Sequence, residues 1–245
     1  MATCRLCLGD KPLCLSHIIP NFFTKQMKNE AGIANKYLVL DANKQGTPGR
    51  GQGGVKEQLF CAECEALLNE RYEKYAYNLL YVRGFEYGEM GSKQAKLAIN
   101  IDYTRFKLFL LSILFRASIS SHEFCSVVDI GRLHEEEIRK MLLYSDPKQP
   151  HNYPILISCV YNNGEVIKDW VLQPSRSRFD MHNCYQFILG SYLYLFIVSS
   201  HRVNKKIDSF VLNINGTAVI MNQDLKKIKN VMSFLGKVIQ NSIIN

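Results

Sequence analysis

Two Cys-x-x-Cys pairs, Cys4 with Cys7 and Cys61 with Cys64, restrict the fold of this chain more than any other feature. A Cys-x-x-Cys turn delivers two thiolates to one ion from a short loop, and two such turns complete a tetrahedral structural zinc site. Because the two pairs have identical spacing, a shared zinc ion is favoured over chance occurrence or burial of the cysteines as small apolar groups. The sequence therefore predicts that residues 4–64 fold around one closed zinc site.

Composition is that of an ordinary globular protein with a hydrophobic core. Of 245 residues, 47% are hydrophobic and 21% are charged. The other four cysteines are scattered singly, and no secretory signal is visible at the start, so we expect reduced thiols and a cytoplasmic location. No apolar run reaches the ~18 residues of a membrane-spanning helix, so no membrane partner is expected.

The net charge of +8 is concentrated in the later part of the chain. Residues 1–90 contain 11 Lys/Arg and 10 Asp/Glu, whereas residues 91–245 contain 19 and 12. A basic chain can bind phosphate-rich partners, although the same charge can serve only solubility. The candidates for nucleic-acid contact, against the alternative of a solvated surface, are Arg176, Arg178, Lys205 and Lys206.

Hydrophobic periodicity predicts an α+β fold with a boundary near residue 91. In the first segment, 1–91, the glycine-rich stretch Gly46–Gly54 is typical of a flexible loop. The other elements expected there are a tight turn at Cys4–Cys7, a short hairpin leading into Leu13–Pro20, a short helix over Asn21–Asn29 and a helix over Glu63–Arg83.

The second segment, 92–245, is expected to begin with helices over about 92–145 and to continue with antiparallel hairpins over about 153–221. Asn163-Gly164 and Asn215-Gly216 suit hairpin turns because Asn and Gly tolerate positive φ. A terminal helix is predicted over about 223–243. The finer elements expected are helices at Ser92–Ser121 and Arg132–Tyr144, and strands at Ile155–Tyr161, Glu165–Leu172, Gln186–Gly190, Tyr192–Val198, Ser209–Ile214 and Thr217–Met221.

Between the two cysteine pairs lies the segment Ser16-His17-Ile18-Ile19-Pro20, and the second pair occurs as Leu-Phe-Cys-x-x-Cys before a helical pattern. Over residues 4–75 this arrangement resembles the zinc-stapled branch of the HNH endonucleases. The resemblance implies a ββα-metal module, made of a β-hairpin and a helix, at the start of the α+β chain. It also implies that His17 acts as general base on water, while a divalent Mg²⁺ or Mn²⁺ ion stabilises the scissile phosphate.

The chain departs from the family pattern at two positions. Ser16 stands where the family usually has an acidic metal ligand, and Glu65 stands where it usually has Asn or His. A carboxylate can hold Mg²⁺ or Mn²⁺, so Glu65 is a candidate ligand, and Asn69 lies one turn further along the same helix face, followed by Glu73. The alternatives are a solvated helix face, and a His17 that packs against the zinc turn or ligates the zinc.

Three functional hypotheses follow, and all depend on the residues around His17. The leading one is a metal-dependent endonuclease with His17, Glu65 and Asn69 as catalytic residues, DNA favoured over RNA as substrate, and a bacterial anti-phage or restriction setting implied by resemblance alone. The alternative is an inactive zinc scaffold in a binding or regulatory protein, and a third reading is a nuclease that needs a partner or signal. Residues 92–245 would then bind a protein partner or form a homodimer. The other five histidines show no metal-ligand spacing with one another: His122, His134, His151, His182 and His201.

Overall fold

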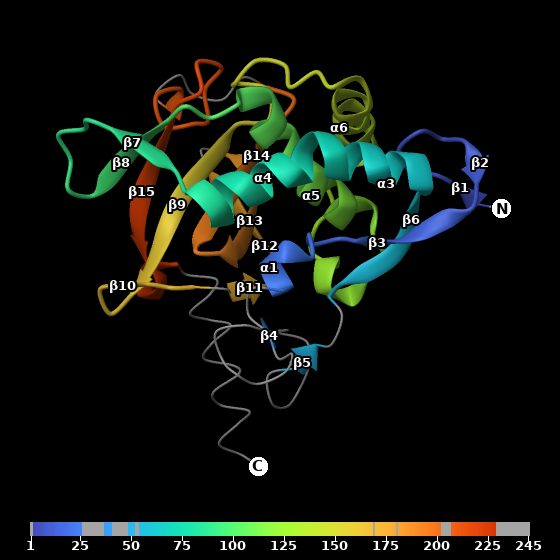
Figure 1. Ribbon diagram of the computed structural model, residues 1–245, viewed down its shortest axis with the longest axis horizontal. Helices are drawn as coiled ribbons and strands as arrows, with labels where there is room; N and C mark the ends of the chain where they lie inside the picture. Colours follow the sequence, from blue (N-terminus) through green and yellow to red (C-terminus); the bar gives the residue numbers. More distant parts are fainter. Residues whose placement is uncertain are drawn as a thin grey trace, which may run out of the picture.

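The computed structural model describes residues 2–25, 37–40, 49–51, 54–168, 170–179, 181–201 and 207–228. Within these residues the largest element is an 11-stranded sheet in the order β5-β4-β11-β13-β14-β9-β15-β8-β7, with β10 beside β9 and β12 beside β13 (Figure 1). Neighbours are antiparallel, apart from the parallel pairs β4–β11 and β9–β15. The strands are β4 (Tyr37–Leu40), β5 (Gly49–Gly51), β7 (Glu86–Gly88), β8 (Ala95–Ile99), β9 (Ile155–Asn162), β10 (Glu165–Val166), β11 (Trp170–Leu172), β12 (Ser175–Phe179), β13 (His182–Gly190), β14 (Tyr192–Val198) and β15 (Ala218–Asp224).

The centre of the sheet consists of β9, β14 and β13, whose residues are mainly apolar and mostly buried. Such runs are typical of strands covered on both faces, because an edge or half-exposed strand alternates apolar and polar residues. Leu189 pairs with Tyr192, so a two-residue loop joins β13 to β14. Gly190 in this loop has a φ of 65°, the left-handed conformation that tight hairpins require. The strands predicted at Ile155–Tyr161 and Tyr192–Val198 are confirmed, and Gln186–Gly190 is the second half of β13. The single strand predicted over Glu165–Leu172 is wrong, because it is divided into β10, which pairs with β9, and β11, which pairs with β13 and β4.

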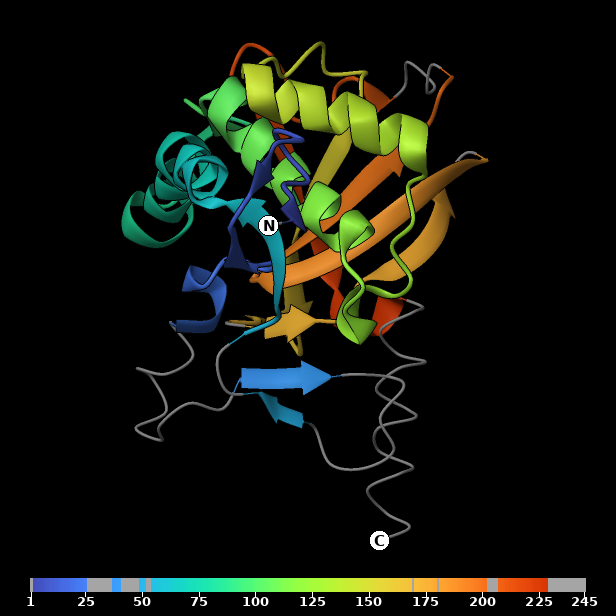
Figure 2. The ribbon, with the colours of Figure 1, turned by 90° about the vertical axis from the view of Figure 1, so that its right-hand side faces the viewer.

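Helix α5 (Tyr103–Ile119) lies between the sheet and the outer helices (Figures 1 and 2). The side chain of Asp102 caps its first turn by accepting a hydrogen bond of 2.9 Å from the Arg105 amide. Most of its side chains are buried, as expected for a helix surrounded by other elements. Phe106 of α5 packs edge-on against Phe85. No helix among the described residues has the length and apolarity needed to cross a bilayer.

Two antiparallel strands and a long helix form the part of the fold that contains the cysteine pairs. β3 (Leu13–His17) pairs with β6 (Lys56–Cys61), and β6 leads directly into the helix. The helix predicted over Glu63–Arg83 is confirmed, and it ends where Gly84 adopts a φ of 73°. It is composed of α3 (Ala62–Leu68), the π-helical turn η1 (Asn69–Glu73), α4 (Lys74–Tyr77) and the π-helical turn η2 (Asn78–Arg83).

One hydrophobic cluster contains buried residues from both sides of residue 91. It extends from Cys4 and Phe60, near the cysteine pairs, to Phe187 and Phe196 in the centre of the sheet. Strands β4 and β5 of the first segment also join the sheet formed by the second. The two segments predicted from the sequence therefore share one hydrophobic core.

The helix predicted over Ser92–Ser121 is wrong in its first third. Ala95–Ile99 is strand β8, which pairs with β7 and β15, and the helix begins only at Tyr103. Lys96 of β8 is exposed and Ala98 is buried, so the strand is only partly covered. Apolar residues recur at helical spacing from Tyr103 onward, but this spacing does not hold for Ala95–Ile99. That segment is a strand because it pairs with β15, which lies far away in the sequence. The helix predicted over Arg132–Tyr144 is confirmed as α6 (Arg132–Tyr144).

The prediction is also wrong in parts of the C-terminal region. Ser209–Ile214 does not form a strand, and only Val211 makes an isolated bridge to Leu156. The expected start of the terminal helix at Gln223 is occupied by the end of β15 and the short 3-10 helix η5 (Leu225–Lys227). The rest of that predicted helix, beyond residue 228, lies outside the described residues.

Two expectations for the first segment fall partly on undescribed residues. The short helix predicted over Asn21–Asn29 is present as α1 (Phe22–Lys25), and its remainder lies outside the described residues. The loop predicted over Gly46–Gly54 includes a short strand, β5, which pairs with β4. Its other residues, apart from Gly54, are not described.

Candidate metal centre

The first cysteine pair lies on the tight turn that the spacing predicts. The turn connects β1 (Ala2–Thr3) with β2 (Asp10–Lys11), and it is closed by hydrogen bonds from the Cys4 amide to the Gly9 carbonyl and from the Leu8 amide to the Cys4 carbonyl. From α6, the Arg139 guanidinium donates a 2.7 Å hydrogen bond to the carbonyl of Leu6. Contacts from outside the turn therefore fix the loop that presents Cys4 and Cys7.

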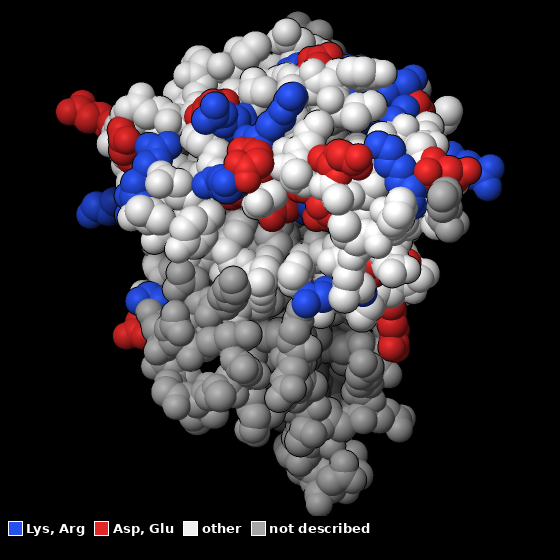
Figure 3. All heavy atoms as spheres, turned by 45° about the vertical axis from the view of Figure 1, so that its right-hand side comes forward, with Lys and Arg blue, Asp and Glu red and all other residues white. Residues whose placement is uncertain are grey.

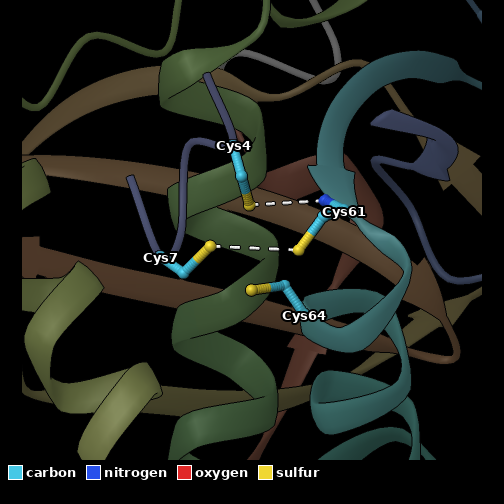
Figure 4. Close-up of side chains that lie close together, drawn as sticks. All are labelled: Cys4, Cys7, Cys61 and Cys64. Atoms are coloured by element: carbon cyan, nitrogen blue, oxygen red, sulfur yellow. Dashed lines mark hydrogen bonds between the residues drawn. The ribbon is translucent and has the colours of Figure 1, made fainter. Parts of the chain in front are cut away.

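The second pair lies where a strand changes into a helix. Cys61 is the last residue of β6 and the N-cap of α3, and Cys64 is in the first turn of that helix. Helix N-termini favour negative charge, so this position suits thiolates. The change from β6 to α3 brings Cys61 and Cys64 to the same side of the chain, facing the first pair (Figure 4).

The four sulfur atoms lie within 4.8 Å of one another. The Sγ atoms of Cys7 and Cys61 are 3.9 Å apart, and the Cys61 amide donates a 3.3 Å hydrogen bond to Sγ of Cys4 (Figure 4). A tetrahedron with Zn–S bonds of ~2.3 Å has edges of ~3.8 Å, so this spacing suits a metal ion of that size. The four cysteines, predicted from spacing alone to share an ion, are therefore brought together in a group that could hold a metal.

Burial and hydrogen bonding shift the pKa values of these thiols in opposite directions. Desolvation raises the pKa of Cys61 to about 11 and raises that of Cys64 above the ordinary range. For Cys4, desolvation is outweighed by amide hydrogen bonds, chiefly from Cys7 and Cys61, and the pKa is lowered to about 7. Metal binding to such a set requires thiolates, so it must release protons from Cys61 and Cys64.

His17, the predicted general base, is at the end of β3, opposite Lys56 on β6. It is half-buried, and its Nε2 atom is shielded from solvent. Gly54 lies against the ring, because a Cβ atom at that position would stand 3.4 Å from Cδ2 of His17. The preceding residue, Ser16, is buried, and its Oγ has no hydrogen-bond partner among the described residues.

The three residues of the predicted ligand face of the helix, Glu65, Asn69 and Glu73, have different environments. Glu65 is half-buried, and its Oε1 atom is buried without a hydrogen-bond partner in the described part of the chain. Asn69 is exposed. Glu73 forms a 2.7 Å ion pair with Arg116 of α5, a buried residue that the sequence did not single out. Among described residues, only the four cysteines form a group of three or more His, Cys, Asp or Glu ligands close enough to share an ion.

The predicted nucleic-acid contacts are only partly described. Arg176 and Arg178 are exposed on β12, and Arg176 donates a 3.2 Å hydrogen bond to the Asn183 side chain on β13. Lys205 and Lys206 lie outside the described residues. On the face in Figure 3, basic and acidic side chains lie interspersed. Their arrangement on this face does not single out one basic surface for a phosphate backbone.

The fold brings the four cysteines together into a group that could hold a metal ion. Residues such as Arg116 and Arg139 support the centre from α5 and α6, and local sequence patterns carry no signal for such distant contacts. No protein-family model matches this chain, and no curated protein or solved structure shows significant similarity to it.

Proposed function

We propose that the protein is a metal-dependent endonuclease of HNH type, built around a structural zinc ion held by Cys4, Cys7, Cys61 and Cys64. One observation carries the proposal: two antiparallel strands lead into a helix at the cysteine group, with His17 on the first strand and Glu65 on the helix. This is the order of elements and residues that the resemblance of the sequence implies. The setting proposed is bacterial restriction or anti-phage defence, with DNA favoured as substrate.

In this proposal His17 takes a proton from the attacking water, which suits an imidazole because it titrates near neutral pH. The Oε1 of Glu65, which is buried and has no hydrogen-bond partner among the residues that the structure describes, is an oxygen ligand of the kind that Mg²⁺ or Mn²⁺ prefers. Such ions often take only one or two carboxylates and complete their shell with water and substrate phosphate, so Glu65 with Asn69 nearby fits this role. When bound, the ion would stabilise charge on the scissile phosphate and the leaving oxygen.

The first prediction concerns His17. We expect His17→Ala to abolish Mg²⁺- or Mn²⁺-dependent nicking of plasmid DNA, because the general base is lost, with zinc content and melting temperature unchanged. Glu65→Gln should also lose activity and should reduce the response to Mn²⁺. Glu70→Gln, an exposed residue of the same helix, is the matched control and should nick like the wild type. Undiminished nicking by His17→Ala, with zinc retained, would contradict the proposal.

The second candidate function is a zinc scaffold that binds a partner without cutting it. Ser16 in place of an acid, together with the shielded Nε2 of His17, favours this reading. It predicts that purified wild-type protein with Mg²⁺, Mn²⁺ or Ni²⁺ cleaves neither DNA nor RNA and contains one tightly held zinc. Cleavage that depends on His17 would exclude it.

A further inference from the structure

A polar pocket of about 340 Å³ lies beside α6, away from the cysteine group in sequence. Three of its lining residues are His134, His151 and His201, which come from α6, from the loop before β9 and from the segment after β14. The remaining wall consists of Glu137, Asn152, Tyr153, Ser199 and Ser200. Three imidazoles far apart in the chain therefore meet at one cavity.

His134 is held in a defined orientation at this pocket. Its Nδ1 is 3.0 Å from the hydroxyl of Tyr153, and its Nε2 is 3.4 Å from Oγ of Ser200. The rings of His134 and Tyr153 pack edge to face. Burial raises the pKa of Tyr153 to about 12, and the protonated phenol can donate a hydrogen bond to Nδ1. In that tautomer Nε2 carries the ring N–H and directs it toward Oγ of Ser200.

The loop between α6 and β9 forms a second wall of the pocket, and helix α5 holds this loop in place. Lys148 and Tyr153 both have positive φ, a conformation uncommon for such residues. From α5, the Lys107 ammonium donates to the Gln149 carbonyl at 2.8 Å and the Tyr103 hydroxyl donates to the Lys148 carbonyl at 2.9 Å. These bonds attach the loop to a buried helix, so the pocket wall is preformed.

The lining groups are mostly hydrogen-bond donors. The imidazoles, two serine hydroxyls and the Asn152 amide can all donate, whereas the acidic lining residue is Glu137. Lys148 forms an ion pair with Glu137 and compensates its charge. The histidines and Glu137 do not form a group close enough to share one metal ion. The donor groups of the pocket are separated from one another, and the charge of Glu137 is compensated by Lys148. Such a lining suits a ligand with several acceptor oxygens.

We propose that this pocket binds a small ligand carrying a phosphate-type oxyanion, with His151, His201 and Ser200 as donors to its oxygens and His134 positioning the Ser200 hydroxyl. The volume is at the lower end for small-molecule sites, about 300–1,000 Å³, and exceeds what inorganic phosphate alone would fill. A phosphorylated small molecule is therefore the ligand class, and the site is separate from the proposed nuclease centre.

Calorimetric titration of the zinc-saturated full chain with inorganic phosphate and with AMP tests the proposal. We expect saturable binding of at least one probe. The double variant His151→Ala/His201→Ala should bind at least about tenfold more weakly, because hydrogen bonds to a charged group are lost. Both histidines are exposed, so these substitutions should leave the melting temperature unchanged. His182→Ala, on β13 and outside the pocket lining, should bind like the wild type.

Each outcome of the titration either supports or overturns the proposed binding of a phosphorylated ligand. Binding of AMP alone supports a phosphorylated organic ligand, and equal binding of both probes supports recognition of the oxyanion itself. Failure of the wild type to bind either probe, or equal binding by the double variant, overturns the proposal. Uptake of a second Zn²⁺ or Ni²⁺ ion that the double substitution removes, without phosphate binding, overturns it in favour of a metal site.

Discussion

Lys107 is inside the protein on α5, with only 2% of its surface exposed. Its Nζ atom donates hydrogen bonds of 2.8 Å to the Tyr103 hydroxyl and to the Gln149 carbonyl. Burial disfavours the charged ammonium and lowers the pKa of Lys107 from 10.5 to about 7. Lys107 therefore links the central helix to the loop before β9. Because its pKa is lowered in the folded protein, it also makes the free energy of unfolding depend on pH.

We expect the free energy of unfolding to rise as the pH increases from about 7 toward 10. In this window the unfolded chain binds a proton at Lys107 that the folded chain has largely lost, so raising the pH favours the folded state, by at most ~1.4 kcal/mol per pH unit. Urea denaturation of the zinc-saturated protein at several pH values measures the slope. Lys107→Met should lower that slope, whatever its own stability, and an unchanged slope would contradict the assignment to Lys107.

At the scale of elements, Arg116 of α5 connects the central helix to η1 in the long helix. Only 1% of the Arg116 side chain is exposed, and its ion-pair partner, the Glu73 side chain, is 18% exposed. The guanidinium also lies over the ring of Phe60 on β6, 5.8 Å from the ring centre. Nε and Nη1 of Arg116 have no hydrogen-bond partner among the described residues, so Glu73 is the main compensation for this buried charge.

We expect Glu73→Gln to destabilise the protein by roughly 2–4 kcal/mol, because it leaves a buried guanidinium without its counter-charge. Glu70→Gln is the matched control on the same turn. Glu70 pairs with Lys74 at the surface, so its loss should cost no more than ~0.5 kcal/mol. Denaturant unfolding measures both values, and equal effects of the two substitutions would show that the Arg116 pair is not a major contribution.

At the scale of the whole molecule, the cysteine group joins two parts of the chain that also contact α6. The turn carrying Cys4 and Cys7 is held by Arg139, and the second pair begins the helix that packs on α5. Metal binding to such a group contributes directly to folding, because the unfolded chain offers no preformed site. The predicted zinc ion would therefore stabilise both the turn and the start of the long helix.

We expect one zinc ion per chain by elemental analysis, and removal by a strong chelator should lower the melting temperature. Cys64→Ser should lose the ion and show the lower melting temperature without chelator. Cys14→Ser provides the control, since Cys14 is on β3 but outside the cysteine group. A wild type that purifies without zinc, or a Cys14→Ser variant that loses it, would argue against the four-cysteine assignment.

Features that depend on local pattern could be read from the amino-acid sequence alone. The four cysteines, the central strands and the helices at 62–83 and 132–144 could be predicted because spacing and periodicity are written in consecutive residues. The π-helical turns could not, because nothing in the local pattern distinguishes them from α-helix.

Contacts between residues distant in the chain became apparent only in the folded protein. It made Ala95–Ile99 a strand beside β15, buried Arg116 against Glu73, and gathered His134, His151 and His201 at one pocket. Residues so far apart have no local periodicity to relate them. Their contacts follow from how the strands pair and the helices pack, and that order is set by burial of the whole hydrophobic core.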